Sequence, residues 1–462
     1  MQGSMNAGPG LALPPHALSL GRLDRRLEAS ARVLLGLLGQ SRAAFQPRQV
    51  WTARRDARVR ALVAYAAVTV PYYRELFQRL DLRPESFHTA EDLERLPLLE
   101  KAAVRANLQA FRSESPAGRT ALPFLTSGST GEPLTIYHDR ASLLADVGYR
   151  ERERQVMRRL LGSPWPPMTM ATGYSGRTAF RHRSYMRALT LLPVAYRRRA
   201  TPMTLSLDEI IDRINRLRPP VISGLAGFLE MLFRHAQHCG ALRHRPAAAI
   251  TNGERLSDEG RDLIERSFAV AVVSHYNAVE CFRLAFACER RRGYHLHADL
   301  AHLRLIDDHG RPAPTGGSGR VVISNLVNRG TVLLNYVLGD VARFADEPCP
   351  CGRTLPLLAD VEGRQEDFLL LPDGSRLHPR YIWLALRETP GLLRYQFEQR
   401  SLTEYHLRMA VSDPQALVDL QPSIVEALRG RLGPQAQIEL DLTDGWSGPP
   451  GKARPVISRL RS

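Results

Sequence analysis

Lysine is nearly absent from this 462-residue chain. It occurs only at Lys101 and Lys452, so almost all of the 63 Lys and Arg residues are arginine. The formal net charge of +16 does not require an acidic partner, because the arginines alternate with acids in stretches such as residues 150–159. That mixture is typical of solvated helix faces. We therefore expect no nucleic-acid partner.

Long apolar runs are also missing. No stretch approaches the roughly 18–20 residues that span a bilayer, and residues 11–20 are interrupted by prolines and follow no basic residue. We expect neither a secretory signal nor a membrane partner. The five cysteines are an odd number, and four of them lie between Cys281 and Cys351. This spacing argues against a disulfide framework and favours a reducing compartment, the cytoplasm.

The first 110 or so residues carry apolar side chains at helical spacing. They predict helices over 58–70, 71–80 and 91–111. A short strand at 121–125 then runs into a polar loop at 126–134, and a long helix is expected over 141–162.

Helices and strands alternate between residues 206 and 277. Ser206 and Glu209 have capping-box spacing at the start of the first of these helices. The alternation predicts βαβ units around a mostly parallel sheet. The expected helices are 207–218, 228–239 and 258–268, and the expected strands are 220–224, 247–254 and 269–277.

Strands dominate from Arg283 onward. A hairpin at 368–379, turning on Asp373 and Gly374, begins a final segment with a second hairpin at 395–411, flanking helices and a last strand at 436–442. This segment has the size of a small α+β domain, so we place a boundary near Gly363.

The polar loop has the composition of a phosphate site. Small hydroxyls and unhindered backbone N–H groups allow a polyphosphate to approach closely, although the same residues alone also fit a simple polar turn. The loop residues are Ser127, Gly128, Ser129, Thr130 and Gly131.

Six motifs in order give the chain a family resemblance. The segments are TSGSTGEPLTIYHD from Thr126, NGERL from Asn252, HYNAVE from His275, NYVLGD from Asn335, VEGRQED from Val361 and GKARPVI ending at Ile457. Together they resemble the adenylate-forming enzymes, in particular the phenylacetate–CoA ligase family and its capsule-biosynthesis-like relatives.

The resemblance implies an α/β fold of two domains. Residues 1–363 would form the adenylation body with βαβ-wrapped sheets, and residues 364–462 a mobile C-terminal α+β lid. The implied reaction joins a carboxylic acid, aromatic or arylacetic as first choice, to ATP as an acyl adenylate and then transfers the acyl group to CoA. Mg²⁺ would assist, and the oligomeric state is open, a dimer included.

The resemblance also assigns roles to individual residues. Thr126 and the five loop residues would hold the β- and γ-phosphates. Gly253 and Glu254 would lie beside adenine, and Tyr276 and Asn277 would line the nucleotide pocket. Asp340 would bind the ribose hydroxyls, Glu280 would carry Mg²⁺, Arg364 would contact ribose or phosphate, and Glu366 would be the hinge residue. Asn277, Val279 and Glu366 depart from the family pattern of Gly, Thr or Ser, and Asp.

Lys452 would be the catalytic cation of this scheme. Attack of a carboxylate on the α-phosphorus brings two anions together, and a cation between them lowers the barrier. A compact ammonium can bridge two differently placed oxygens, whereas a planar guanidinium favours a bidentate fork. A lysine retained in an arginine-rich chain therefore indicates a chemical requirement. For Lys101, near a helix start, the sequence suggests only a structural or substrate-edge role.

A cysteine–histidine pattern predicts a structural Zn²⁺ site. Cys288, His295, Cys349 and Cys351 would supply three thiolates and one imidazole, which completes a tetrahedral site. Related family members carry a similar pattern. His297 is a competing ligand and Cys281 a remote one, and reduced core cysteines are the alternative reading.

Two rival functions remain open. The acyl acceptor would be an amine, a hydroxyl or a carrier-protein thiol in the first. In the second, the chain would be a basic nucleic-acid-binding protein with an inactive nucleotide fold, which predicts salt-sensitive retention of DNA or RNA.

Overall fold

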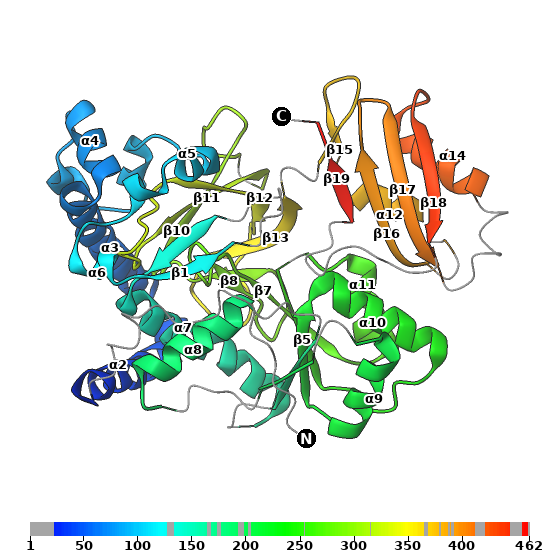
Figure 1. The fold of residues 1–462 in the computed structure, drawn as a ribbon, viewed down its shortest axis with the longest axis horizontal. Helices are drawn as coiled ribbons and strands as arrows, with labels where there is room; N and C mark the ends of the chain where they lie inside the picture. Colours follow the sequence, from blue (N-terminus) through cyan, green and yellow to red (C-terminus); the bar gives the residue numbers. More distant parts are fainter. Residues whose placement is uncertain are drawn as a thin grey trace.

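The computed structural model describes residues 23–460 except for 127–133, 164–167, 173–176, 193–197, 202–204, 254, 315, 365–367, 378–379, 387–388, 390–391, 412–420 and 444–454. A large mixed sheet of 11 strands and a separate sheet of four strands organise these residues (Figure 1). The expected α/β fold is confirmed. No helix among the described residues has the length and apolar character needed to cross a membrane.

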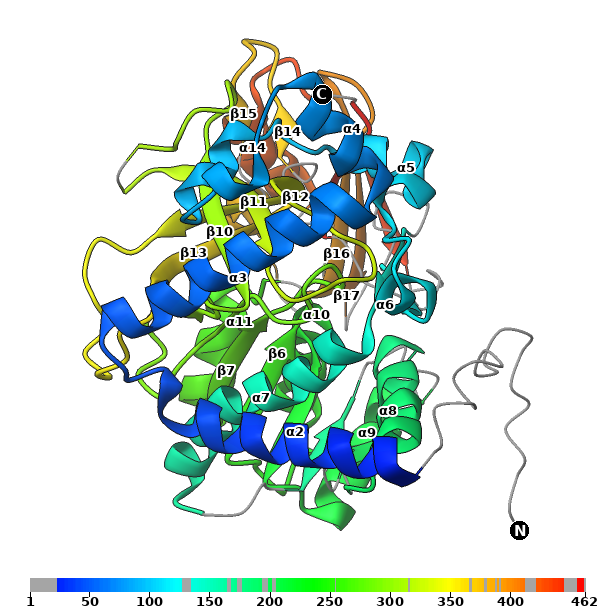
Figure 2. The same cartoon turned by 90° about the vertical axis from the view of Figure 1, so that its left-hand side faces the viewer.

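Helices dominate the N-terminal region, as expected. They are α2 (Leu23–Ala43), α3 (Arg48–Thr69), α4 (Pro71–Arg79), η1 (Pro84–Ser86), η2 (Glu91–Arg95), α5 (Lys101–Ala106), η3 (Leu108–Phe111) and α6 (Pro116–Arg119). Figure 2 shows α3 lying across the strands of the large sheet, with α2 running below it in front of α7.

The single helix predicted over 91–111 is wrong. Leu96 has an extended backbone with ψ of 145°, the conformation that a following proline favours, here Pro97. The segment therefore divides into η2, α5 and η3. The extended stretch between η2 and α5 lets Leu99 form a parallel bridge with Tyr336 of the large sheet.

The predicted strand at 121–125 is present as β1 (Leu122–Leu125). It pairs in an antiparallel hairpin with β2 (Thr135–His138), a strand that the sequence did not indicate. Next comes α7 (Arg140–Leu161), where the Asp139 side chain accepts hydrogen bonds from the first-turn amides of Ala141 and Ser142. α8 (Arg177–Leu189) lies beside α7 and β1.

Parallel strands form one half of the large sheet, in the order β7-β6-β5-β3-β4. Alternate residues on them face opposite sides. Val221, Ala248 and Val273 pack with α7, while Ile222, Ala249 and Val272 pack with α9 and α10. The predicted βαβ pattern and the Ser206–Glu209 capping box are both confirmed. The elements are β3 (Thr169–Ala171), β4 (Arg198–Ala200), α9 (Leu207–Leu217), β5 (Val221–Leu225), α10 (Ala226–Cys239), β6 (Ala248–Asn252), α11 (Asp258–Asp262), η4 (Leu263–Ser267) and β7 (Ala271–Tyr276).

Antiparallel strands form the other half, in the order β10-β11-β12-β13-β9-β8, and β8 joins them to β7. Chain segments on either side of residue 283 therefore share one sheet. The strands are β8 (Ala285–Phe286), β9 (Tyr294–Leu296), β10 (Ala301–Ile306), β11 (Ser318–Asn325), β12 (Tyr336–Phe344) and β13 (Leu357–Arg364).

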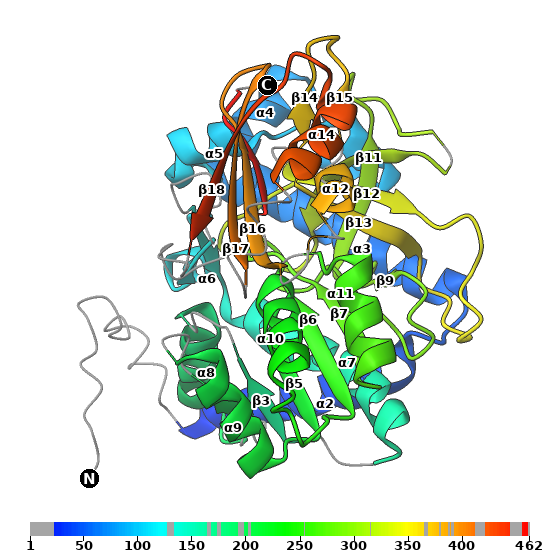
Figure 3. The ribbon, with the colours of Figure 1, turned by 90° about the vertical axis from the view of Figure 1, so that its right-hand side faces the viewer.

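A four-stranded sheet in the order β18-β17-β16-β19 follows β13. The last strand was not the predicted one at 436–442, because β19 follows it and pairs in parallel with β16. α10 of the body lies next to β16 (Figures 1 and 3). The elements are β14 (Leu369–Leu370), β15 (Arg376–Leu377), α12 (Arg380–Leu386), β16 (Leu392–Gln399), β17 (Glu404–Val411), α14 (Gln421–Leu432), β18 (Gln437–Thr443) and β19 (Val456–Ser458).

Candidate active site

Asp340 lies at the centre of the predicted nucleotide residues. It is a cross-strand partner of Arg364 in the β12–β13 ladder, and its Oδ1 lies 2.8 Å from Arg364 Nε. Its Oδ2 accepts a hydrogen bond of 2.7 Å from the hydroxyl of Tyr276 at the end of β7. The structure thus brings three predicted residues from three strands into contact.

The Tyr276 hydroxyl keeps its proton in this arrangement. Burial and then the charge of Asp340 raise the pKa of Tyr276 well above its ordinary value. A protonated hydroxyl donates and so fixes one carboxylate oxygen of Asp340, while Arg364 fixes the other. An ionised carboxylate has about four acceptor positions, so two donors leave acceptor capacity for ribose hydroxyls.

Glu280 is buried close to this group. Asn325 donates a hydrogen bond of 2.8 Å to its backbone carbonyl, and the Tyr336 hydroxyl lies 3.5 Å from its Oε1. Burial raises the pKa of Glu280, and the positive charges of Lys101 and Arg364 partly offset that rise. Hard carboxylate oxygens suit Mg²⁺, so the donor chemistry of Glu280 fits the predicted ion.

Lys101, for which the sequence suggested only a structural or substrate-edge role, lies near the candidate site. It is the first residue of α5, and its charge acts on Glu280. The Leu99–Tyr336 bridge brings it there: the Leu99 amide donates to the Asn335 carbonyl at 2.9 Å, and the Val337 amide donates to the Leu99 carbonyl at 3.0 Å. Its rarity as a lysine and its place near a helix start were the available signals.

Thr126 closes the base of the predicted phosphate loop. Its amide donates to the Leu134 carbonyl at 2.9 Å, and the Leu134 amide donates to its hydroxyl at 2.8 Å. Both ends of the loop are therefore held together at the turn end of the β1–β2 hairpin. The residues between them, Ser127, Gly128, Ser129, Thr130 and Gly131, lie outside the described part of the chain.

The predicted adenine segment and the predicted pocket segment at Tyr276 and Asn277 also lie side by side. β6 and β7 are parallel neighbours, and the side-chain amides of Asn252 and Asn277 at their ends are 3.2 Å apart. Gly253 has φ of +79°, a conformation that disfavours other residues. Glu254, Glu366 and Lys452 lie outside the described residues.

The four predicted zinc ligands converge. One ligand atom from each of Cys288, His295, Cys349 and Cys351 lies within 4.8 Å of all the others. Cys288 and Cys349 have sulfur atoms 3.6 Å apart, and Cys351 Sγ lies 3.3 Å from His295 Nε2. Zn–S and Zn–N bonds of about 2.3 and 2.1 Å at tetrahedral angles give similar separations, so the residues fit a zinc ion.

The competing zinc ligands lie elsewhere. His297 is buried with its Nε2 3.7 Å from Glu153, and neither it nor Cys281 belongs to the group. The cluster joins the segment around β8 and β9 to the loop between β12 and β13, the strands that carry Asp340 and Arg364.

Comparison with known proteins agrees with this arrangement. The chain is 26% identical over 383 residues to phenylacetate-coenzyme A ligase of Thermus thermophilus, covering 80% of this chain and 83% of the relative. The chain is a homologue of phenylacetate–CoA ligase. The predicted family resemblance is confirmed.

More distant relatives extend the same relationship. Protein CapK of Staphylococcus aureus is 20% identical over 401 residues, covering 84% of this chain and 85% of CapK. The solved structure of 2-hydroxyisobutyryl-CoA ligase with its 2-HIB-AMP adenylate has a TM-score of 0.67 at 19% identity, covering 90% of this chain and 91% of that one. Its likeness shows the shared fold. No family model matches the chain.

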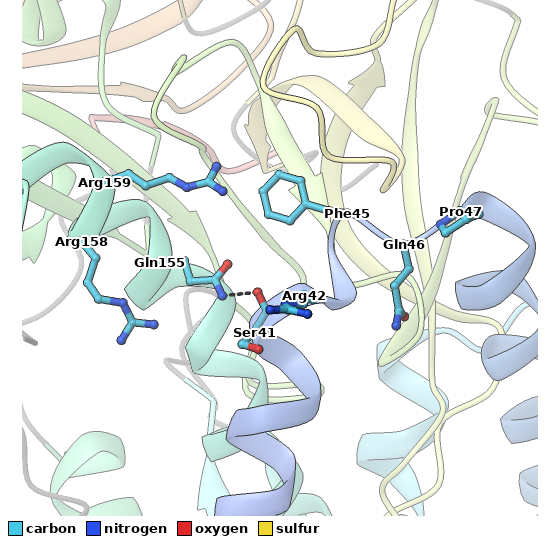
Figure 4. Close-up of a pocket in the computed structure, with 8 residues that line it drawn as sticks. All are labelled: Ser41, Arg42, Phe45, Gln46, Pro47, Gln155, Arg158 and Arg159. Atoms are coloured by element: carbon cyan, nitrogen blue, oxygen red, sulfur yellow. Dashed lines mark hydrogen bonds between the residues drawn. The ribbon is translucent and has the colours of Figure 1, made fainter. Parts of the chain in front are cut away.

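A surface hollow of about 680 Å³ lies between the end of α2 and α7 (Figure 4). Arginines line much of it, and two are ion-paired: Arg158 with Glu151, and Arg159 with Glu289 at 2.7 Å. None of its lining residues belongs to the predicted nucleotide set, so this ligase homologue has its candidate site elsewhere. The lining residues are Ser41, Arg42, Phe45, Gln46, Pro47, Gln155, Arg158 and Arg159.

Proposed function

We propose that this chain is an AMP-forming acid–CoA ligase. It would activate a carboxylic acid with ATP and transfer the acyl group to CoA. The observation that carries the proposal is the Asp340 carboxylate, held between Tyr276 and Arg364 in the same sheet that contains β6 and β7.

Each described residue has a task in this reaction. Asp340 would accept hydrogen bonds from the ribose hydroxyls, while Tyr276 and Arg364 keep its two oxygens oriented. Glu280 would hold Mg²⁺, which neutralises phosphate charge when bound. Lys101 would add a positive charge near Glu280, which favours the binding of negatively charged phosphates. Such prearranged charges stabilise a transition state without reorganisation during the reaction.

The adenylation step itself would depend on Lys452. We assign residues 1–363 to the body and residues 364–462 to a lid that delivers this ammonium between the carboxylate and the α-phosphate. The described strand after the lysine loop, β19, is an edge strand of the small sheet. A lid that withdraws after adenylation would open the path for the thiol, with Glu366 in the hinge.

The acid would be aromatic or arylacetic, because the Thermus relative is a phenylacetate-coenzyme A ligase. CoA is the preferred acceptor on the same ground. The structural zinc would be held by the cysteine–histidine cluster, whose thiolates need a reducing compartment such as the cytoplasm.

Pyrophosphate release measured across a panel of carboxylic acids, with and without CoA, tests the proposal. We expect release with an arylacetic or aromatic acid and consumption of CoA in equal amount. Turnover with an amine or hydroxyl acceptor and no CoA would replace the ligase assignment. Salt-sensitive retention of DNA or RNA, without any pyrophosphate release that depends on a carboxylic acid, would overturn the ligase proposal.

Lys452 variants separate the two half-reactions. Lys452→Ala and Lys452→Arg should each lower acyl-AMP formation by about 10²–10³-fold and leave thioester formation from supplied acyl-AMP nearly unchanged. Arg454→Ala is a matched control, since it removes a cation two residues away. A Lys452→Arg enzyme that adenylates at the parent rate would contradict the role of the lysine.

A further inference from the structure

α2 carries a stripe of exposed leucines. Leu23, Leu27, Leu34, Leu35 and Leu38 are 63%, 54%, 48%, 68% and 73% exposed, and they make up five of the 12 large apolar side chains exposed in the described part of the chain. At about 100° per residue they occupy one side of the helix. Contiguous exposed apolar surface of this kind marks an interaction site.

The opposite side of α2 already holds the helix on the body. Ala29 and Val33 are buried against Leu143 and Val147 of α7. Gly36 and Gly148 permit a close crossing there, since a Cβ on Gly148 would lie 3.3 Å from the Gly36 backbone. The leucine stripe is therefore not needed to dock α2, and in Figure 2 α2 is the foremost element on its side of the molecule.

Four of the five leucines are spaced symmetrically about the middle of the stripe, and Leu35 stands outside this symmetry. Leu23 and Leu27 are four residues apart, as are Leu34 and Leu38, and the two pairs are equally far from the point between Ser30 and Ala31. A two-fold axis through that point places Leu23 opposite Leu38 and Leu27 opposite Leu34 of an antiparallel copy. The small exposed side chain of Ala31 then allows close approach near the axis, while Ser30 beside it is buried and accepts a hydrogen bond of 2.9 Å from the Leu191 amide.

We infer that the leucine stripe of α2 is the interface of a two-fold symmetric homodimer, with the two α2 helices antiparallel. Charge supports this direction. Asp24 and Arg42 are 18 residues apart, which is about five turns, so both lie on the same flank of the stripe. Antiparallel helices bring the Asp24 end of one copy to the Arg42 end of the other, whereas parallel helices would oppose like charges.

A membrane surface fits the same face less well. Interfacial helices carry mainly Lys and Arg beside the apolar face. α2 carries two acids among its four arginines; Arg32 is ion-paired with Glu28 at 2.7 Å, and Arg26 donates to the Arg187 and Thr190 carbonyls of the body. A second copy of the chain would bury the leucines and bring Arg42 near Asp24.

Sedimentation velocity of the full-length protein over a concentration series tests the inference. We expect a dimer, and Leu34→Glu with Leu38→Glu should weaken its association by at least about tenfold. Leu80→Glu and Leu402→Glu are matched controls on other exposed leucines, 42% and 41% exposed, and should leave it unchanged. An unchanged far-UV circular dichroism spectrum will show that the variants are folded.

A charge swap tests the antiparallel direction. Asp24→Arg and Arg42→Asp should each weaken the dimer, and the double variant should restore it. A parent that is monomeric at every attainable concentration, or a dimer insensitive to the Leu34 and Leu38 changes, would overturn the inference. Binding of a monomeric parent to anionic phospholipid vesicles through Leu34 and Leu38 would assign the stripe to a membrane instead.

Discussion

Arg364 Nε lies 2.8 Å from Asp340 Oδ1, and the two residues are direct partners in the β12–β13 ladder. Arg364 is also the last residue of β13, and the small sheet follows it in the chain. The proposed ribose carboxylate is therefore oriented by the residue where the proposed lid begins. A movement of the backbone after Arg364 would act directly on the nucleotide contact.

The first prediction concerns Asp340. Asp340→Ala should lower kcat/KM for ATP by about 10–100-fold, because charge-assisted hydrogen bonds contribute about 1.5–3 kcal/mol each. Tyr276→Phe should lower kcat/KM for ATP by a smaller factor, since it removes only a hydroxyl that orients Asp340. Steady-state pyrophosphate release at varied ATP measures both effects.

Dideoxy-ATP distinguishes ribose binding from a structural effect at Asp340. The preference for ATP over 2′,3′-dideoxy-ATP should nearly disappear in Asp340→Ala. Asp360→Ala is the matched control, because Asp360 lies on β13 and pairs with Arg255 at 3.0 Å. An undiminished preference for ATP in Asp340→Ala would refute the ribose contact.

The second prediction concerns the cysteine–histidine cluster. Elemental analysis should find about one zinc per chain, and Cys349→Ser should lose it, because three ligands rarely retain a structural ion. The apparent unfolding temperature should fall by at least about 5 °C. Cys239→Ser, at an exposed cysteine outside the cluster, should keep the metal. Equal zinc in both variants would exclude the site.

The third prediction concerns pH. Burial lowers the pKa of His138, His297 and His302 to about 4, whereas the unfolded chain titrates near 6.5. Between these values the unfolded state binds more protons, so stability falls as pH falls. Each histidine should contribute about 1.4 kcal/mol per pH unit in that window and nothing above it.

Urea unfolding at pH 7.5, 6.5 and 5.5 measures this slope. His302→Gln should reduce the slope by about one proton and change it little above pH 7. The expectation fails if stability is flat between pH 6.5 and 5.5.

The fourth prediction concerns a buried ion pair between α7 and the segment before β10. Arg152 Nη2 lies 2.9 Å from Asp299 Oδ1, and both side chains are fully buried. Burial alone would raise the pKa of Asp299, but the charges of Arg152 and Arg58 lower it to about 2. Asp299→Leu should therefore destabilise the fold by about 3–5 kcal/mol, since it leaves buried arginine unpaired.

The double variant Arg152→Met with Asp299→Leu should recover part of that loss. For comparison, Glu439→Gln breaks the exposed Arg400–Glu439 pair of 2.6 Å and should cost less than about 1 kcal/mol. Similar costs for the two single variants would contradict the assigned difference in burial.

The sequence predicted features that depend on neighbours along the chain. The capping box at Ser206, the βαβ alternation and the cysteine–histidine spacing were recognisable because turns, periodicity and metal ligands leave local patterns. The motifs also placed Tyr276, Asp340 and Arg364 in one site without any knowledge of how they touch.

Long-range pairing left no such pattern. The sheet that joins parallel and antiparallel strands depends on β8 bridging β7 and β9. The charge of Lys101 acts on Glu280, and the extended backbone before Pro97 lets Leu99, two residues before Lys101, pair with Tyr336 of the large sheet. Side-chain periodicity along 91–111 fitted a helix, and the backbone restriction before proline overrode it.

The Leu99–Tyr336 bridge joins the N-terminal region to β12, the strand that carries Asp340. A shortened enzyme beginning after residue 110 would lose both a lysine beside Glu280 and the backbone partner of the strand that carries Asp340. The N-terminal segment can therefore be replaced or removed less freely than its position before the sheet in the sequence suggests.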